Sequence, residues 1–454
     1  MDQPNHSGPS LNRRRFLVAT AAAAAAGTTT LLAPSAVRRT FAAAARDTTT
    51  LTVMYAANEL TPAYIKQFEG MNPDIKIRFV VYNQTTLNSM VAAGKPPDLF
   101  RQGAVGSVPY TLQGVNEDLT SYLAKSTVLK ESDLLAVNNL FRWDGKQQGK
   151  GPIYGIVKDW SLDYTLWAND KLLSAAGYKH IGENQPPSYE DVLAMGKKMT
   201  VKKNGQTAVY GYDLAWGWSQ HFTILQIMAK AAGSSLFSAD LKKSNFTSPE
   251  VLKALQWLVD YCRAGVGTSP LLTDATSPTA PFVAGRTALS SIGYWFGEQV
   301  ETDPHHLSSY MYNVPAPSWQ GVRVSPCGAG IGISMASKSQ NKDAAWKLIE
   351  YFMAGQPAID RAKGGWGLAS LKSMQQYLPQ ATAFDKERYR VTQNDLKHFA
   401  SLPLTPYADF TAMATAVTTE LTKVLKGNQT LTTAAKNVEQ TIDKLIAQTI
   451  AATS

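Results

Sequence analysis

Hydrophobic positions in the first part of the chain alternate between the period of a strand and the period of a helix. Strands are predicted over 50–55, 75–81 and 98–100, where apolar residues run together or alternate with polar ones. Helices are predicted over 60–70, where apolar residues recur every fourth position, and over 85–93, which precedes a glycine and two prolines. Strands that alternate with helices across short loops predict a parallel, doubly wound sheet.

The same alternation returns in the middle of the chain, with a strand predicted over 209–212 and a helix over 249–265. Helical periods dominate the C-terminal part. There, one helix face carries the apolar residues Leu431, Ala435, Val438, Ile442 and Leu445. Lys436 and Lys444 fall on the opposite face, which we expect to be solvated. No segment of 20–50 residues repeats, so two α/β lobes are the simplest architecture.

Composition narrows the class of protein. The 454 residues are 44% hydrophobic, 10% aromatic and 17% charged, which excludes a disordered chain, a collagen-like repeat and a disulfide-framed miniprotein. The net charge is +9; five arginines against one aspartate within residues 1–45 contribute +4, which leaves +5 for the remainder. Because the remainder has no run of five like charges, we do not expect nucleic acid as a partner.

The N-terminal region resembles an export signal. Arg13, Arg14 and Arg15 precede an uncharged, alanine-rich stretch that is followed by small residues up to Ala45. The order Arg-Arg-x-Phe-Leu resembles the twin-arginine signal, which exports folded proteins. We expect cleavage near Ala45, with a retained membrane anchor as the alternative, although the run is shorter than a bilayer span requires. No cysteine lies nearby, so we expect no lipoprotein anchor and a mature protein outside the cytoplasm.

The chain has two cysteines, Cys262 and Cys327. A bridge between them is possible in an oxidising compartment. However, Cys262 continues the apolar helix stripe of Leu255, Leu258 and Val259, which is typical of a buried thiol. We therefore favour two separate buried thiols.

Six segments stand out along the chain: F-E…N-P-D-I (68–75), G-K-P-P-D-L (94–99), Y-G-I-V…W-A-N-D-K-L-L (154–173), P-S-Y-E-D-V-L (187–193), F-V-A-G-R-T-A-L…G-Y-W (282–295) and A-A-W-K-L-I (344–349). In this order, they resemble motifs of the extracytoplasmic sugar-binding proteins of ABC importers, the maltodextrin-binding-like family (solute-binding protein family 1). Each motif is weak alone, but six in order are specific. Val157 and Tyr189 depart from the usual Pro and Trp, and the segment before the glycine-rich strand also differs, so ligand identity is less transferable than fold.

The resemblance implies an α/β, two-lobe periplasmic-binding-protein fold of type II, with each lobe a doubly wound sheet flanked by helices. By analogy, 46–157 plus 312–355 form lobe one, and 158–311 plus 356–454 form lobe two. It also implies that a carbohydrate is captured between the lobes by hinge closure and delivered to the permease of an ABC importer. We expect a monomer that is not an enzyme and that needs no cofactor or metal.

Aromatic side chains are the first candidates for sugar contacts, because flat rings cover the C–H face of a sugar. The resemblance places Trp295 at the cleft, beside Tyr294, and often places the loop of Trp366 there. Further candidates are Trp216 and Trp218, expected in an exposed loop, and Trp160 beside Asp159 in a crossing segment. We expect Trp295 to contribute most to affinity. By contrast, the strand or helix-stripe positions of Trp167, Trp257 and Trp346 predict core packing.

Polar candidates follow the predicted strands of lobe one, where open α/β sheets bind ligands. They are Asn58 and Glu59 after the first strand, Gln84 after the second, and Arg101 and Gln102 after the third. Two weaker candidates are Asp163 and, from the resemblance, Tyr407.

Two other functions stay open at this point. A secreted carbohydrate-active enzyme would need two carboxylates about 5–10 Å apart. The candidates for such a pair are Glu59, Asp98, Asp159, Asp163 and Glu298. A binder of another solute on the same fold is the second alternative. The sequence has no G-x-S-x-G, H-E-x-x-H, P-loop or G-x-G-x-x-G motif. The pair His305–His306 diverges on any regular element, so we do not expect a metal there.

Overall fold

The computed structural model describes residues 48–273, 279–328 and 330–453. The expected export signal at 1–45 therefore lies outside the described residues. Within those ranges, no helix combines the length and the apolar character needed to cross a bilayer.

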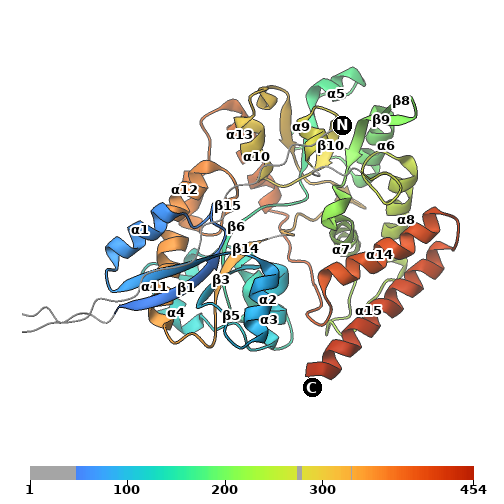
Figure 1. Cartoon of the computed structure of the whole chain (residues 1–454). Helices are drawn as coiled ribbons and strands as arrows, with labels where there is room; N and C mark the ends of the chain where they lie inside the picture. Colours follow the sequence, from blue (N-terminus) through green and yellow to red (C-terminus); the bar gives the residue numbers. More distant parts are fainter. Residues whose placement is uncertain (1–47, 274–278, 329, 454) are drawn as a thin grey trace, which may run out of the picture. The chain divides into compact units, whose positions relative to one another are not determined.

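A six-stranded mixed sheet organises the first lobe (Figure 1). Its order is β15 (Leu368–Ala369), β6 (Ile156–Trp160), β14 (Ile331–Met335), β3 (Leu99–Gly103), β1 (Thr49–Tyr55) and β2 (Ile75–Val81). β1 runs parallel to β2 and β3, which confirms the predicted parallel start, whereas β14 is antiparallel to β3 and β6.

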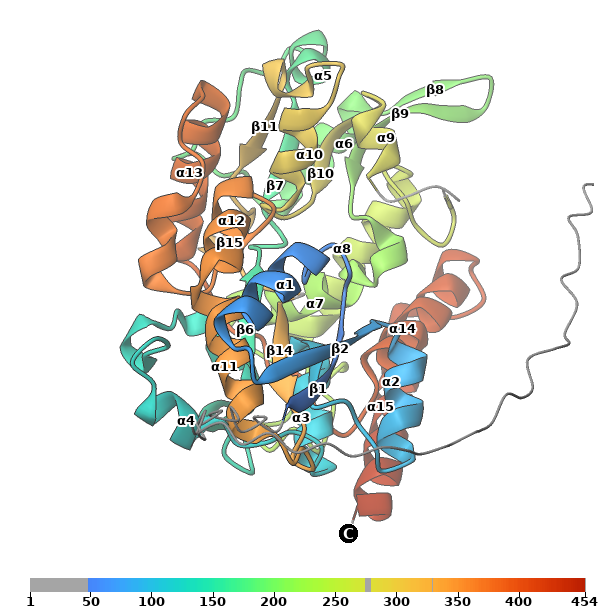
Figure 2. The same ribbon diagram turned by 60° about the vertical axis from the view of Figure 1, so that its left-hand side comes forward.

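Helices cover both faces of this sheet (Figure 2). On one face, Phe68 of α1 (Pro62–Met71) and Phe352 of α11 (Lys342–Ala354) pack against Val53 of β1. On the other face, Leu87 of α2 (Gln84–Ala92) packs with Phe100 of β3. The remaining elements of this lobe are α3 (Ala104–Leu112), α4 (Thr120–Lys125), α12 (Gln356–Gly364), the 3-10 turns η1 (Glu131–Asp133), η2 (Ala136–Phe141) and η5 (Lys372–Tyr377), and the hairpin β4 (Arg142–Trp143) and β5 (Gln148–Ile153).

A five-stranded sheet organises the second lobe. Its order is β11 (Met311–Val314), β7 (Leu166–Asn169), β10 (Thr287–Ser291), β9 (Gln206–Asp213) and β8 (Val201–Lys203). Only β9 and β10 are parallel; the other neighbours are antiparallel. The short elements here are α5 (Asp170–Ala175), α9 (Ala280–Val283), α10 (Phe296–Thr302), the 3-10 turns η3 (Trp216–Trp218) and η4 (Leu307–Ser309), and the hairpin β12 (Ser318–Trp319) and β13 (Val322–Arg323).

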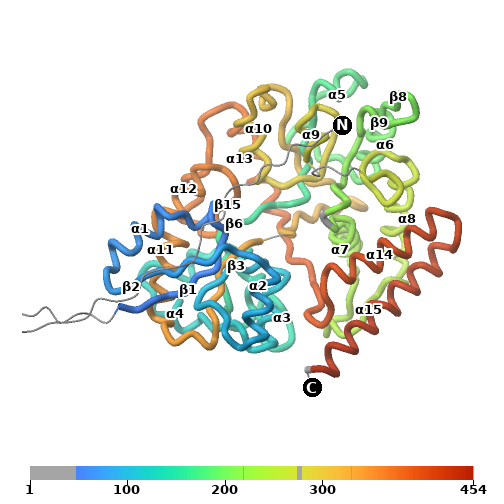
Figure 3. The backbone as a smooth tube through the Cα atoms, viewed as in Figure 1, coloured from blue at the N-terminus to red at the C-terminus, as the bar shows by residue number. Residues whose placement is uncertain are grey.

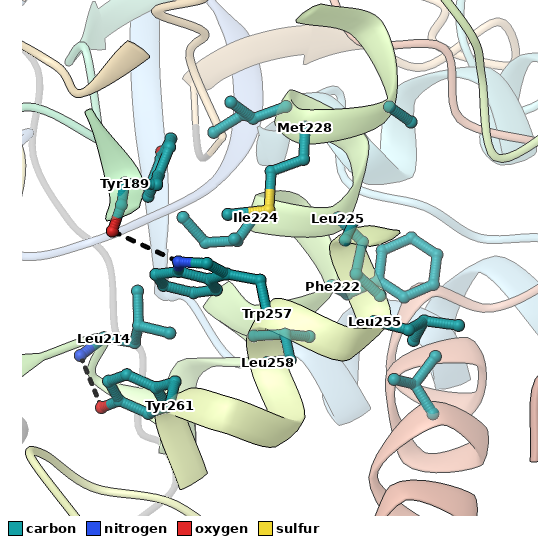
Figure 4. Packing of buried hydrophobic residues seen from close by; sticks show 14 of the residues in the cluster. Tyr189, Leu214, Phe222, Ile224, Leu225, Met228, Leu255, Trp257, Leu258 and Tyr261 are labelled. Carbon is teal, nitrogen blue, oxygen red and sulfur yellow. Dashed lines mark hydrogen bonds between the residues drawn. The ribbon is translucent and has the colours of Figure 1, made fainter. Parts of the chain in front are cut away.

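Long helices build the core of the second lobe. They are α6 (Tyr189–Met199), α7 (Gln220–Ala231), α8 (Pro249–Ala264), α13 (Ala383–Leu396), α14 (Phe410–Leu425) and α15 (Leu431–Thr453). Trp257 of α8 is buried as predicted, and its indole donates to the carbonyl of Tyr189 at 3.2 Å (Figure 4). The apolar stripe of α15 is also confirmed, because Ala435, Val438 and Ile442 are buried.

The order of the elements shows that the chain crosses between the lobes three times, and Figure 3 traces the backbone through both lobes. The crossings fall at 161–165, between β6 and β7; at 324–328, between β13 and β14; and beyond η5, before α13. These positions differ from the expected borders at 157, 311 and 355. The third differs most, because Ala358 and Ala362 of α12 pack into the core of the first lobe and β15 joins its sheet.

Both cysteines are buried and neither forms a disulfide, as favoured from the sequence. Cys262 lies in the helical core of the second lobe, whereas Cys327 lies on the second crossing. Burial raises the pKa of Cys262 to about 12, so this thiol stays protonated and unreactive at neutral pH.

Candidate functional site

A cavity of about 270 Å³ lies between residues of the two lobes. The first lobe contributes the start of α3 and the end of β3, and the second contributes the turn before α10 and the starts of α7 and α14. The lining residues are Gly103, Ala104, Val105, Asp163, Tyr164, Gln220, Thr223, Gly293, Trp295, Gly328, Ile331 and Phe410. A ligand here would therefore contact both lobes and two of the crossings.

This cavity continues into two others, and we call the three together the interlobe groove. A narrow middle cavity shares Thr223, Gly328 and Phe410 with the first. It also shares Leu140 and Leu402 with a third cavity of about 200 Å³. The far end lies between the β5 hairpin and the segment at 401–404. The groove is thus longer than its first cavity alone.

The groove is lined by apolar, amide and hydroxyl groups. Asp163 is the one charged side chain among its described lining residues. Gln220 is buried and its side-chain Oε1 has no hydrogen-bond partner among the described residues. Burial raises the pKa of Tyr164 far above its ordinary value, so its phenol stays neutral and can exchange only hydrogen bonds. Such a lining suits a neutral ligand with many hydroxyl groups.

Two tryptophans of the predicted set meet at one end of the groove. Trp295 lines the first cavity, and its ring centroid lies 5.8 Å from that of Trp366, with the two planes tilted by 48°. Trp295 precedes α10 of the second lobe, whereas Trp366 lies between α12 and β15 of the first. Trp366 is 46% exposed, which is unusual for so large an apolar side chain.

Three predicted polar residues form an ionic cluster with Lys158, next to the Trp366 turn. Arg101 Nε lies 3.2 Å from Glu59, and the buried Lys158 Nζ lies 3.6 Å from Glu59 and pairs with Asp159. A Cβ on Gly367 would lie 2.9 Å from Asp159 Cβ, so the chain beside Trp366 passes directly over this cluster. Burial lowers the pKa of Arg101, but the hydrogen bond and charge of Glu59 outweigh it and raise that pKa overall.

The cluster continues toward the predicted Gln84. Arg101 lies over the ring of Tyr82, 5.1 Å from its centroid, and the Tyr82 hydroxyl donates to Gln84 at 2.6 Å. Gln84 also donates to the hydroxyl of Tyr110 at 3.1 Å. Asn58 is exposed in the turn after β1.

Asp163, a weak sequence candidate, lies in the groove wall. Its Oδ2 accepts from the backbone N–H of Gly328 at 2.8 Å, which joins the first and second crossings. A Cβ on Gly293 would lie 2.8 Å from Asp163 Oδ1, so a glycine is needed where the turn before Trp295 approaches this crossing.

Other predicted aromatic residues pack in the core. Tyr294 is buried among residues of the first lobe, while Trp295 after it lines the cavity. Trp160 is buried and its indole donates to the carbonyl of Ala369 at 3.1 Å. The expectation that Trp216 is exposed is wrong: it is 7% exposed, because its ring stacks on His221 at 4.3 Å.

Three further candidates lie elsewhere or are not described. Gln102 lies within β3 rather than after it, is buried, and its Oε1 accepts from Asn116 at 3.1 Å and from Ser334 at 2.6 Å. Tyr407 is partly buried against the core of the second lobe. The side chain of Trp218 is outside the described part.

Sequence reasoning missed Lys158, Tyr164, Gln220, Thr223 and Phe410. One signal was available: Gln220 and Thr223 stand three residues apart at the start of a helix, directly after the tryptophan turn, and so share one face. Nothing in the local sequence separates Tyr164 or Phe410 from ordinary core residues.

In the structure, four of the five carboxylates considered for an enzyme pair, all but Glu298, are engaged with other groups. Glu59 and Asp159 share Lys158, and Asp98 accepts from the backbone of Thr52 at 2.8 Å. Across the described ranges, no group of three or more His, Cys, Asp or Glu residues is arranged to hold a metal ion.

The fold and the groove define a two-lobe binding protein, and comparison with known proteins gives its family. Residues 53–354 match the family of bacterial extracellular solute-binding proteins, so the chain belongs to that family. No curated protein shows a significant match to the chain.

Several solved structures of binding proteins have a similar fold. The ABC substrate-binding protein Lmo0181 from Listeria monocytogenes, in complex with cycloalternan, is 25% identical over 88% of this chain and 100% of its own, with a TM-score of 0.73. The cyclic α-maltosyl-1,6-maltose binding protein from Arthrobacter globiformis is 20% identical over 88% and 100%, with a TM-score of 0.69. The sugar-binding protein MalE from Xanthomonas citri is 19% identical over 88% and 98%, also with a TM-score of 0.69.

Proposed function

We propose that this protein captures a carbohydrate in the interlobe groove, closes its lobes around it and delivers it to the membrane permease of an ABC importer. It acts as a monomer outside the cytoplasm after export by a twin-arginine signal, and it does no chemistry on the sugar. Closure follows from contact with both lobes, because a ligand shifts an open–closed equilibrium only through contacts that differ between the states.

The observation that carries this proposal is the tryptophan pair at the end of a groove lined by both lobes. Trp295 presents a ring to the cavity, and the exposed Trp366 lies 5.8 Å away. Ring faces cover the apolar side of a sugar, whereas the unpartnered acceptor of Gln220 can receive one of its hydroxyl groups. The sugars named for the relatives of known structure support the same ligand class.

The alternative of a glycoside hydrolase is less well supported by the site. A hydrolase needs one protonated carboxyl as general acid beside a second carboxylate. Glu59 and Asp159 instead lie in ion pairs, Glu59 with Arg101 and Lys158, and Asp159 with Lys158. The described lining residues of the groove include one carboxylate, that of Asp163, whereas a hydrolase site needs two.

A thermal-shift panel of mono-, di- and oligosaccharides and cyclic glucans tests the proposal. A glycan at 100 times its Kd should stabilise the protein by about 2.7 kcal/mol, which is readily seen as a higher Tm. The same mixtures, analysed after long incubation, should contain no shortened products. Absence of any shift at millimolar glycan would overturn carbohydrate binding, and shortened products would favour the hydrolase.

A further inference from the structure

A buried arginine underlies both tryptophans of the pair. Arg388 of α13 is 1% exposed at its side chain. A Cβ on Gly297 would lie 1.8 Å from its Nη1, and a Cβ on Gly365 would lie 2.8 Å from its Nη2. Gly297 stands two residues after Trp295, and Gly365 stands immediately before Trp366. The guanidinium therefore fills a slot between the turn of the second lobe and the turn of the first.

Aromatic rings bound the same slot. The Arg388 guanidinium carbon lies 4.5 Å from the ring centroid of Tyr294 and 5.5 Å from that of Phe384. Tyr294 is directly joined to Trp295, so its ring couples the position of the guanidinium to the turn that presents the indole. A flat cation packs against a ring face in a way that an ammonium group does not reproduce.

The electrostatics of this arrangement are costly for a merely structural residue. Arg388 pairs with Asp385 at 3.3 Å, and the charge of Glu301 also acts on this pair. Its Nε and Nη1 have no hydrogen-bond partner among the described residues. A buried cation with unused donors destabilises a fold relative to an apolar side chain of similar volume, and such a group calls for an explanation.

We propose that Arg388 is a positioning residue that holds Trp295 and Trp366 in the paired geometry that receives the sugar. That the tryptophan pair receives a sugar rests on the proposed function. That Arg388 holds the two rings in place is a property of the ligand-free protein and can be tested without a sugar. Arg388 reaches both turns from a third element, so it fixes the distance and tilt between rings that belong to different lobes. Without it, each indole follows its own lobe.

The test compares Arg388→Met, Arg388→Lys and the matched control Thr392→Val. Methionine keeps an unbranched chain of similar length without charge, and lysine keeps the charge without the flat group. Thr392 lies one turn further along the same helix, is buried, and donates its hydroxyl to the backbone carbonyl of Arg388 at 2.8 Å. Its replacement perturbs α13 without entering the slot.

The first measurement needs no ligand. Two indoles this close give an exciton couplet in circular dichroism, and Trp366→Phe defines the part of the spectrum that belongs to the pair. We expect Arg388→Met and Arg388→Lys to lose this couplet, and Thr392→Val to keep it, at a temperature where all are folded. A couplet retained in Arg388→Lys and in any folded Arg388→Met would overturn the positioning role, as would its loss in Thr392→Val.

The second measurement is the Kd for maltotriose, with cycloalternan as the second probe. Both arginine variants should bind about fivefold more weakly or worse, because truncating support at the centre of an interface removes well-placed ring contacts. An equal loss of affinity in Thr392→Val would reduce the effect to general stability and contradict the proposal. If the wild type binds neither probe, the proposed carbohydrate function is in question, while the couplet still decides on positioning.

Discussion

Replacement of Trp366 by alanine should weaken sugar binding with little loss of stability. Trp366 is 46% exposed, so roughly 110 Å² of a side chain of about 250 Å² is open to a ligand. A sugar that covers half of this surface gains roughly 1.4 kcal/mol at about 25 cal/mol per Å². The Kd of Trp366→Ala should therefore rise by about tenfold.

The matched control is Trp346→Ala, because Trp346 is a tryptophan of the same lobe that is buried in α11, away from the groove. Loss of a buried ring creates a cavity, so this variant should lose about 3–5 kcal/mol of unfolding free energy and keep its Kd. Calorimetry with the most stabilising glycan of the panel gives Kd, and denaturant unfolding gives stability. Native-like affinity in Trp366→Ala, or an equal loss of affinity in the control, would refute the platform role.

Four further predictions address export, closure, pH and thiol chemistry. Replacement of Arg13 and Arg14 by lysine should leave the precursor in the cytoplasm in cell fractionation, and unchanged export would remove the twin-arginine assignment. Small-angle scattering should give a smaller radius of gyration with saturating sugar, and an equal radius would contradict hinge closure. Burial raises the pKa of Asp395 to about 6 in the folded state. Between about pH 4 and 6 the folded protein therefore keeps a proton that the unfolded chain has lost, and the free energy of unfolding falls as the pH rises through this window. Asp395→Asn should therefore become more stable relative to wild type as the pH rises through that window, as measured by unfolding curves at several pH values. A difference in unfolding free energy that stays constant with pH would refute the raised pKa. Cys327 lines the groove, so bound sugar should slow its alkylation, as measured by mass spectrometry. The buried Cys262 should stay unmodified with and without sugar. Equal alkylation rates of Cys327 with and without sugar would place the sugar elsewhere.

The sequence predicted regular elements well, because each has a strong period of its own. The strands β1 and β2 and the helices α1 and α8 begin and end within two residues of the predicted bounds. The helix period alone also indicated that Trp257 is buried. Local periods therefore carry most of the information on which segments form the fold.

The site was harder to predict, because neighbours in sequence have opposite surroundings. Arg101 belongs to the ionic cluster, whereas the adjacent Gln102 is buried among polar side chains on the other face of β3. The ring of Trp216 stacks on that of His221, because the turn between η3 and α7 brings the start of α7 against Trp216. Such contacts depend on packing between distant segments, which no local pattern records.

The last quarter of the chain completes the groove, and this has a consequence for biosynthesis. One side of the groove is lined by Leu402, Leu404 and Phe410, and the other by residues near 104 and 140. Arg388, also from this last quarter, lies beside the turns that carry the tryptophan pair. A nascent chain that stops before α13 would expose an unfinished apolar trough, which favours chaperone capture and aggregation. An export route that accepts only folded cargo would thus double as quality control, because no molecule could leave the cell before its binding site was whole.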